Sequence, residues 1–218
     1  MTEARAEMKL LKKPLFRGHV HQAAFFISLG ACLPLIANAS GERSMIASLV
    51  YSFGLLFLFG TSAIYHRIHW QPEARALMKR LDHSAIFVLI AGTFTPFCLL
   101  ALNETDGKNM LIGVWIAALL GVLQSVFWVK APRWLTAIFY VVIGWSIFPY
   151  LHELQISIGS EKLIFLGMGG VVYTVGAIFY ALKKPWGASE VFGYHELFHV
   201  MTVIGAALHF IVIYQIIK

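Results

Sequence analysis

Seven apolar stretches, each about as long as a membrane-spanning helix, dominate this sequence. A helix needs roughly 20 apolar residues to cross the hydrocarbon core of a bilayer. Hydrophobic residues make up 59% of the 218 residues and charged residues 13%, an excess that one small soluble core cannot hide. The sequence therefore predicts an all-α polytopic membrane protein, a bundle of seven transmembrane helices. The predicted spans are Val20–Ala39, Met45–Tyr65, Ser84–Leu102, Met110–Val129, Trp134–Leu151, Leu163–Leu182 and Tyr194–Ile217.

The connections between these stretches are short, so we expect a single domain over residues 1–218 with a basic cytoplasmic segment at 1–19. Cys32 and Cys98 lie inside apolar runs and have no disulfide or metal-ligand spacing. The run that ends in Ala37-Asn38-Ala39 imitates a secretory signal with its cleavage site. Its charged leader of about 22 residues is long for a signal peptide, so we expect the first span to be retained.

The charged residues indicate how the helices are oriented. If the segments alternate from a cytoplasmic N-terminus, thirteen basic residues fall inside and four outside, which is a positive-inside pattern. The inside residues are Arg5, Lys9, Lys12, Lys13, Arg17, Arg67, Arg75, Lys79, Arg80, Lys130, Arg133, Lys183 and Lys184, and the outside residues are Arg43, Lys108, Lys162 and Lys218. Topology therefore accounts for the net charge of +6 without nucleic acid as a partner. We expect a multi-pass protein of the cytoplasmic membrane with an extracytoplasmic C-terminus and membrane lipid as its partner.

Ionisable side chains inside spans are informative because each costs about 2.5–3.5 kcal/mol at a helix centre. The second span ends in Ser62-Ala-Ile-Tyr-His66, the third opens with Asp82, and the seventh opens with His195-Glu-Leu-Phe-His199. In the predicted topology all of these groups lie near the cytoplasmic side. They are therefore expected to be at one membrane depth.

The spacing of these polar residues points to a metal site. His195 and His199 are four residues apart and share a helix face, as do Ser62 and His66. Two histidines at this spacing can hold one metal ion, and His66 from another helix completes the three-histidine set of a catalytic zinc site. Asp82 and Ser62 are then expected to hydrogen-bond the water in the fourth position.

Each of these residues also has a simpler interpretation. His66 alone is compatible with a hydrated interfacial histidine, and Asp82 alone with an ion pair to Lys79 or Arg80. His209 lies ten residues beyond His199, about 15 Å along a helix, and we interpret it as a hydrogen-bonded histidine packed in the bundle. The expected convergence of the other groups at one depth favours the metal site.

His195-Glu196-Leu-Phe-His199 also matches the H-E-x-x-H pattern of metalloproteases, in which the glutamate is the general base. Intramembrane proteases of the site-2 kind usually carry this motif early in the chain, with a third acidic ligand after it. Here the motif is in the last span and no acidic residue follows Glu196. The protease interpretation therefore fits less well.

The arrangement resembles the haemolysin III family, the bacterial branch of the progestin and adiponectin receptor group. The similar residues are Ser62-x-x-x-His66, the block from Asp82 to Pro96, and His195-x-x-x-His199 followed by Gly205 and His209-Phe210. Arg17-Gly18-His19-Val20-His21 looks like the family's N-terminal histidine motif without the acidic residue that often precedes it.

The resemblance implies a seven-helix bundle with zinc near the cytoplasmic side. It implies His66, His195 and His199 as ligands and Asp82 and Ser62 as the residues that hold the water. Members vary at the position of Glu196, which argues against a required base, and the motif around His21 has no assigned role. Eukaryotic relatives are linked to ceramide hydrolysis, and the bacterial name records a lytic effect.

Three functional hypotheses follow. The first is a zinc-dependent lipid hydrolase that cleaves an amide. The second is a membrane-integrity or sensor protein with structural zinc, and the third is cytolysis by pore formation. No span carries a continuous polar stripe that would line a channel, which disfavours the pore and an ion transporter.

The predicted orientation can be tested with reporter fusions. A reporter after Lys218 is expected outside the cytoplasm, and one inserted between Arg67 and Arg80 inside it, because of the distribution of basic residues. A cytoplasmic reporter at Lys218 in an otherwise folded protein would show that the number of spans is wrong.

Overall fold

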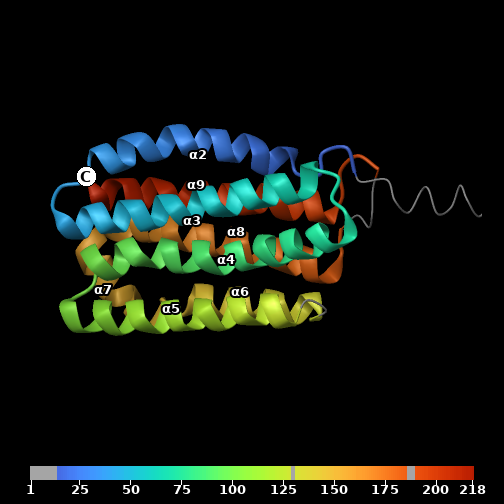
Figure 1. The fold of residues 1–218 in the computed structure, drawn as a ribbon. Helices are drawn as coiled ribbons and strands as arrows, with labels where there is room; N and C mark the ends of the chain where they lie inside the picture. The colour runs from blue at the N-terminus through green and yellow to red at the C-terminus, as the bar shows by residue number, and fades with distance from the viewer. Residues whose placement is uncertain (1–13, 129–130, 186–189) are drawn as a thin grey trace, which may run out of the picture.

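The computed structural model describes residues 14–128, 131–185 and 190–218 (Figure 1). Within these residues the chain is all-helical and has seven helical segments that are long and apolar enough to cross a membrane. The prediction of a seven-helix membrane bundle is therefore confirmed. The elements are α2 (His19–Ala37), α3 (Glu42–Arg67), α4 (Pro72–Leu100), α5 (Glu104–Phe127), α6 (Arg133–Trp145), the 3-10 helix η1 (Phe148–Tyr150), α7 (Leu151–Ile158), α8 (Ser160–Leu182) and α9 (Tyr194–Ile217).

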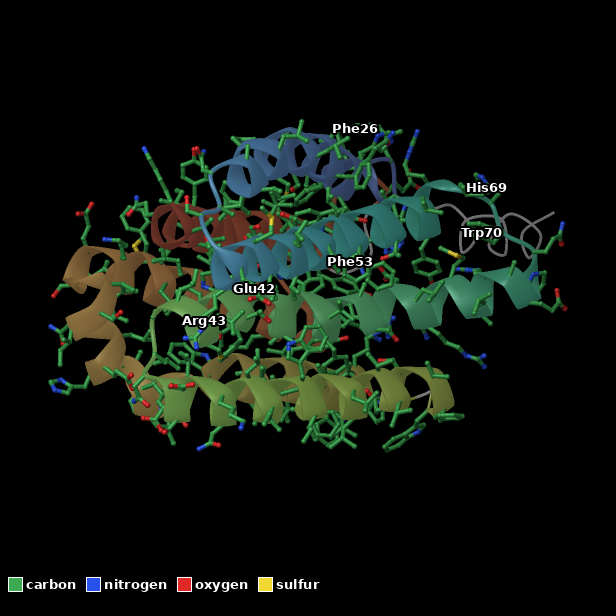
Figure 2. The ribbon with its side chains drawn as sticks, turned by 60° about the vertical axis from the view of Figure 1, so that its left-hand side comes forward. Phe26, Glu42, Arg43, Phe53, His69 and Trp70 are labelled. Carbon is green, nitrogen blue, oxygen red and sulfur yellow. The ribbon has the colours of Figure 1, made fainter. Side chains whose placement is uncertain are left out.

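The helices run roughly side by side along the bundle, with α2 on one outer side and α5 and α6 on the other (Figure 1). α3 packs against α2 and α4, α4 also packs against α5, and α8 packs against α6 and α9. The outer surface is apolar. Phe26 on α2 and Phe53 on α3, labelled in Figure 2, are 62% and 59% exposed. Lipid is the solvent that accepts such a surface.

One end of the bundle carries the predicted polar site. At this end α3 finishes and α4 and α9 begin, and we call it the histidine end because it carries His66, His195 and His199. Figure 2 labels His69 and Trp70 in the connection between α3 and α4 at this end. The C-terminus lies at the opposite end (Figure 1).

The third span begins earlier than predicted, which corrects the expectation that Asp82 opens it. α4 starts at Pro72, so Asp82 lies ten residues inside the helix. The apolar run from Ser84 marks the hydrophobic part of this helix. The helix itself extends further, because proline suits its first turn and residues 74–81 are mostly good helix formers. Asp82 is therefore held by a continuous helix and not by a flexible connection.

The fifth segment is not the continuous helix predicted over Trp134–Leu151. α6 ends at Trp145, the short η1 contains Pro149, and α7 continues to Ile158. Proline lacks the backbone N–H that a helix interior requires, which explains why the chain turns here.

Close contact between α3 and α4 brings Ser62 and His66 of α3 near Asp82 of α4. A Cβ atom at Gly92 would lie 3.3 Å from the carbonyl oxygen of Val50, and one at Gly54 would lie 3.3 Å from that of Val88. Glycine therefore lets the two backbones approach. Most of the basic N-terminal segment, residues 1–13, and Lys130 lie outside the described residues, and the orientation across the membrane stays a prediction.

Candidate metal centre

Two helices bring the three predicted histidine ligands together. His66 is next to the last residue of α3, whereas His195 and His199 lie on the first two turns of α9. One ring nitrogen from each histidine lies within 4.8 Å of the others. The Nε2 atoms of His66 and His195 are 3.2 Å apart. Residues 129 positions apart in the sequence thus meet at one point.

The separation of two of these nitrogens fits binding to one metal ion. Zinc–nitrogen bonds of about 2.0–2.1 Å in a tetrahedral site set two ligand nitrogens about 3.3 Å apart. The separation of 3.2 Å between His66 and His195 matches this value. Imidazole donors suit zinc, copper, iron and nickel, so the donor type alone does not identify the metal. His66 and His199 are buried, so an ion bound to them would be largely removed from bulk solvent.

Asp82 and Ser62 lie beside the histidines, where the sequence predicted them. A carboxylate oxygen of Asp82 is 3.7 Å from Nε2 of His66. Ser62 precedes His66 by one turn of α3, and its hydroxyl is within hydrogen-bonding reach of Asp82. Both side chains are buried. A carboxylate and a hydroxyl are therefore next to the cluster without belonging to it.

Glu196 is 1% exposed, and its carboxylate has two structural partners. One oxygen accepts a hydrogen bond from Arg17 Nε in a salt bridge. The other accepts from the backbone N–H of Gly193 at 2.8 Å, which caps the start of α9. Both oxygens are thus engaged in holding the chain together. This arrangement is a structural reason for the glutamate in the H-E-x-x-H pattern.

The segment before and into α2, residues 14–21, packs over the cluster, and we call it the N-terminal strap. Its start is attached to the segment before α9, because Leu15 N–H donates to the carbonyl of Glu190 at 2.9 Å and Phe16 N–H to that of Val191 at 3.3 Å. The Arg17–Glu196 salt bridge continues this attachment onto α9. The strap therefore connects the start of α2 to the start of α9 at the histidine end.

The strap also contacts two of the candidate ligands. The ring of His21 stacks on that of His199, with centroids 3.9 Å apart and planes at 9°. Gly18 adopts a φ of +84°, and a Cβ atom there would lie 2.8 Å from Cβ of His66. Sequence reasoning singled out this motif but could not assign it a role, because its contacts are with helices that are distant in the sequence.

A cavity of about 720 Å³ extends from the cluster into the bundle. At the histidine end it is lined by the three candidate ligands, His21, Ser62 and Asp82, and elsewhere by residues of α4, α5, α6, α8 and α9. Trp145, Tyr173, Thr174 and His209 also line it. His209 Nε2 donates to the carbonyl of Leu166 at 3.0 Å, and His209 is not part of the three-histidine cluster.

Comparison with known proteins agrees with this architecture. Hemolysin-3 of Bacillus cereus is 31% identical over 215 residues, which cover 96% of this chain and 94% of that protein. A hemolysin-3 homolog of Bacillus subtilis is 32% identical over 216 residues, covering 97% and 98% respectively. The adiponectin receptor protein of Drosophila melanogaster is 26% identical over 226 residues, covering 91% of this chain and 51% of that protein.

The pattern of a known family also matches almost the whole chain. Residues 10–210 match the family described as haemolysin-III related. This range includes the three candidate ligands His66, His195 and His199. Since the match covers far more than half of the chain, this multi-pass membrane protein belongs to the haemolysin III-related family.

Proposed function

We propose that this protein is a zinc-dependent hydrolase that cleaves the acyl amide of a membrane lipid. The observation that carries the proposal is a cluster of three histidines next to a buried carboxylate, at one end of a cavity of about 720 Å³. Catalytic zinc sites have three protein ligands and an open position, whereas structural sites usually have four. The cluster among the described residues has three. The zinc site is taken to face the cytoplasm of a cell membrane, as the distribution of basic residues favours.

The proposed reaction adds water across an amide bond. The C–N bond breaks, the acyl group leaves as a carboxylic acid and the nitrogen leaves as an amine. Zinc held by His66, His195 and His199 would polarise the carbonyl and lower the pKa of bound water to about 7. Asp82, 3.7 Å from His66, is assigned to orient the attacking water and take its proton, and Ser62 to hold the Asp82 carboxylate.

The acyl chain is assigned to the cavity. Its lining includes Ile86, Leu89 and Ile90 of α4 and Ala177 of α8, which are suited to hydrocarbon. The volume is within the range of about 300–1,000 Å³ that is typical of small-molecule sites.

The alternative is a non-enzymatic membrane-integrity, sensor or cytolytic protein in which the metal is structural. Ligands from both α3 and α9 favour it, because a metal would then tie two helices together. Under this alternative Asp82 needs only to neutralise the site, and no substrate enters the cavity. An intramembrane protease is less well supported, because both oxygens of Glu196 are engaged by Arg17 and Gly193.

Zinc content tests the ligand assignment. Purified protein is expected to hold about one zinc, and His66→Ala, His195→Ala and His199→Ala each remove one of three donors and should lower occupancy to near zero. His209→Ala is the matched control on α9, since His209 bonds to Leu166 instead. Elemental analysis gives the result. Loss of zinc in the control together with full zinc in His66→Ala would overturn the assignment.

Substitutions of Asp82 and Glu196 distinguish the hydrolase hypothesis from its alternatives. Asp82→Asn is expected to keep at least part of the zinc and lose acyl-amide hydrolysis by about 10–100-fold, because the neighbouring carboxylate is lost. Glu196→Gln is expected to keep zinc and most activity, since its amide oxygen can still accept from one of the two donors, Arg17 or Gly193, and neither bond involves a candidate ligand. Fatty-acid release with and without chelator measures both. An inactive Glu196→Gln with an active Asp82→Asn would favour the protease, and two fully functional variants would favour structural zinc.

Gly18 tests whether the strap supports the metal site. Gly18→Ala adds a methyl group 2.8 Å from Cβ of His66 and should weaken zinc binding by about tenfold, because the ligand must move. Gly41→Ala is the matched control, with a φ of +83° and no atom within 4 Å of the added methyl. Competition with a chelator reports the zinc affinities. Equal affinities in the two variants would mean that the strap does not position His66.

A further inference from the structure

Three basic residues gather at the histidine end of the cavity. Arg75 and Lys79 lie one turn apart on α4, so they share a helix face, and Arg133 is the first residue of α6. All three line the cavity. The charges of Arg133 and Arg75 are close enough to Lys79 to act on its ammonium group. We call these residues the cation cluster.

Arg75 and Arg133 are not balanced by acidic residues among the described residues of the cavity wall. Among the described residues that line the cavity, Asp82 is the one carboxylate, and it lies against His66. Glu196 is engaged by Arg17. Neither Arg75 nor Arg133 forms an ion pair within the described part of the chain. Arg75 and Arg133 are solvent-exposed at the mouth of the cavity, where like charges repel one another and favour an anion between them.

Membrane topology explains why basic residues occur at this end but not why these face the cavity. Arg133 is held by two aromatic rings: its Nη1 donates to the hydroxyl of Tyr194 at 2.7 Å, and its guanidinium lies 5.6 Å from the Tyr180 ring centroid. Arg75 is within hydrogen-bonding reach of Tyr65. A guanidinium held through one nitrogen keeps further N–H groups for two-point contact with a phosphate or carboxylate.

The cation cluster is also next to the candidate metal centre. Arg133 donates to the hydroxyl of Tyr194, which immediately precedes His195 in α9. The Tyr180 ring that Arg133 faces lies 5.6 Å from the ring of His195. The cavity continues from there past apolar side chains of α4 and α8. A ligand that fills it would therefore have an anionic group at one end, hydrocarbon at the other and its acyl carbonyl between them.

We propose that the cation cluster binds the anionic group of an acyl lipid, a phosphate or a carboxylate, close to the acyl carbonyl. This inference rests on the proposed function, because that function places the reacting carbonyl at the metal site. Binding of the anionic lipid can be measured without turnover. It narrows the substrate class from acyl amides in general to those that carry a negative charge near the amide.

Binding is tested on the full chain in nanodiscs of phosphatidylcholine, with radiolabelled dodecyl phosphate as the probe and unlabelled dodecanoate, dodecanol and inorganic phosphate as competitors. Saturable binding is expected, with Arg75→Gln and Arg133→Gln each weakening it by about tenfold or more, because each removes a charge-assisted contact. Lys183→Gln is the matched control, since Lys183 lies beyond the end of α8 at the same end but is not in the cavity wall. Retained zinc in each variant shows that it has folded.

The competitors distinguish the possible ligands. Displacement by dodecanoate extends the site to carboxylates, and failure of dodecanoate to compete restricts it to phosphates. Either result supports the inference if dodecanol and inorganic phosphate are ineffective at the same concentration. Equal displacement by dodecanol would overturn the anionic requirement, and equal displacement by inorganic phosphate would overturn the requirement for a hydrocarbon chain. Equal weakening by Lys183→Gln would mean that the anion binds the charged protein surface and would overturn the site.

The two proposals fail separately. Dodecyl phosphate binding that persists in a protein without hydrolase activity would remove the proposed function and leave the anion site. Hydrolysis of an anionic acyl amide that is unaffected by Arg75→Gln and Arg133→Gln, together with no saturable binding of dodecyl phosphate, would remove the anion site and leave the hydrolase.

Discussion

The arrangement of the histidine end follows from the cost of burying polar and charged groups among apolar helices. A buried polar group without water needs a partner from the protein, and a buried charge needs one even more. Glu196 therefore meets Arg17 and the Gly193 N–H, and Asp82 meets His66. These partners come from different parts of the chain. Satisfying the polar groups thus also determines how α3, α4, α9 and the N-terminal strap are positioned.

Much of the fold could be predicted because lipid imposes a simple rule on sequence. A span must be apolar over roughly 20 residues, so all seven segments were recognisable, and α9 begins and ends at the predicted residues Tyr194 and Ile217. The candidate ligands were also predictable, because ionisable groups in spans are expensive and their helix spacing is local. The length of α4 and the break after Trp145 were missed, because hydrophobicity marks the membrane and not the limits of a helix.

The contacts that support the site were beyond prediction from the sequence. Arg17 and Glu196 are 179 positions apart, and nothing local in either segment indicates the other. The stacking of His21 on His199 likewise depends on how α2 packs against α9. In the sequence Glu196 stands out only through the H-E-x-x-H pattern, and the structure adds its salt bridge to Arg17. In the sequence, the residues of the cation cluster were interpreted only as part of the positive-inside pattern. The cavity is what distinguishes Arg75 and Arg133 from other basic residues at this end.

The division of the ligands between α3 and α9 has a consequence for biosynthesis. Chains are made from the N-terminus, so His66 enters the membrane long before His195 and His199 are translated. Until α9 inserts, the nascent chain offers one histidine of the cluster, and Arg17 has no Glu196 to pair with. A metal ion held by all three histidines would therefore be captured only as the closing step of assembly, and a ribosome that stalls before α9 would leave a chain with one of the three donors. Loading of such a site would report that the last helix has joined the bundle.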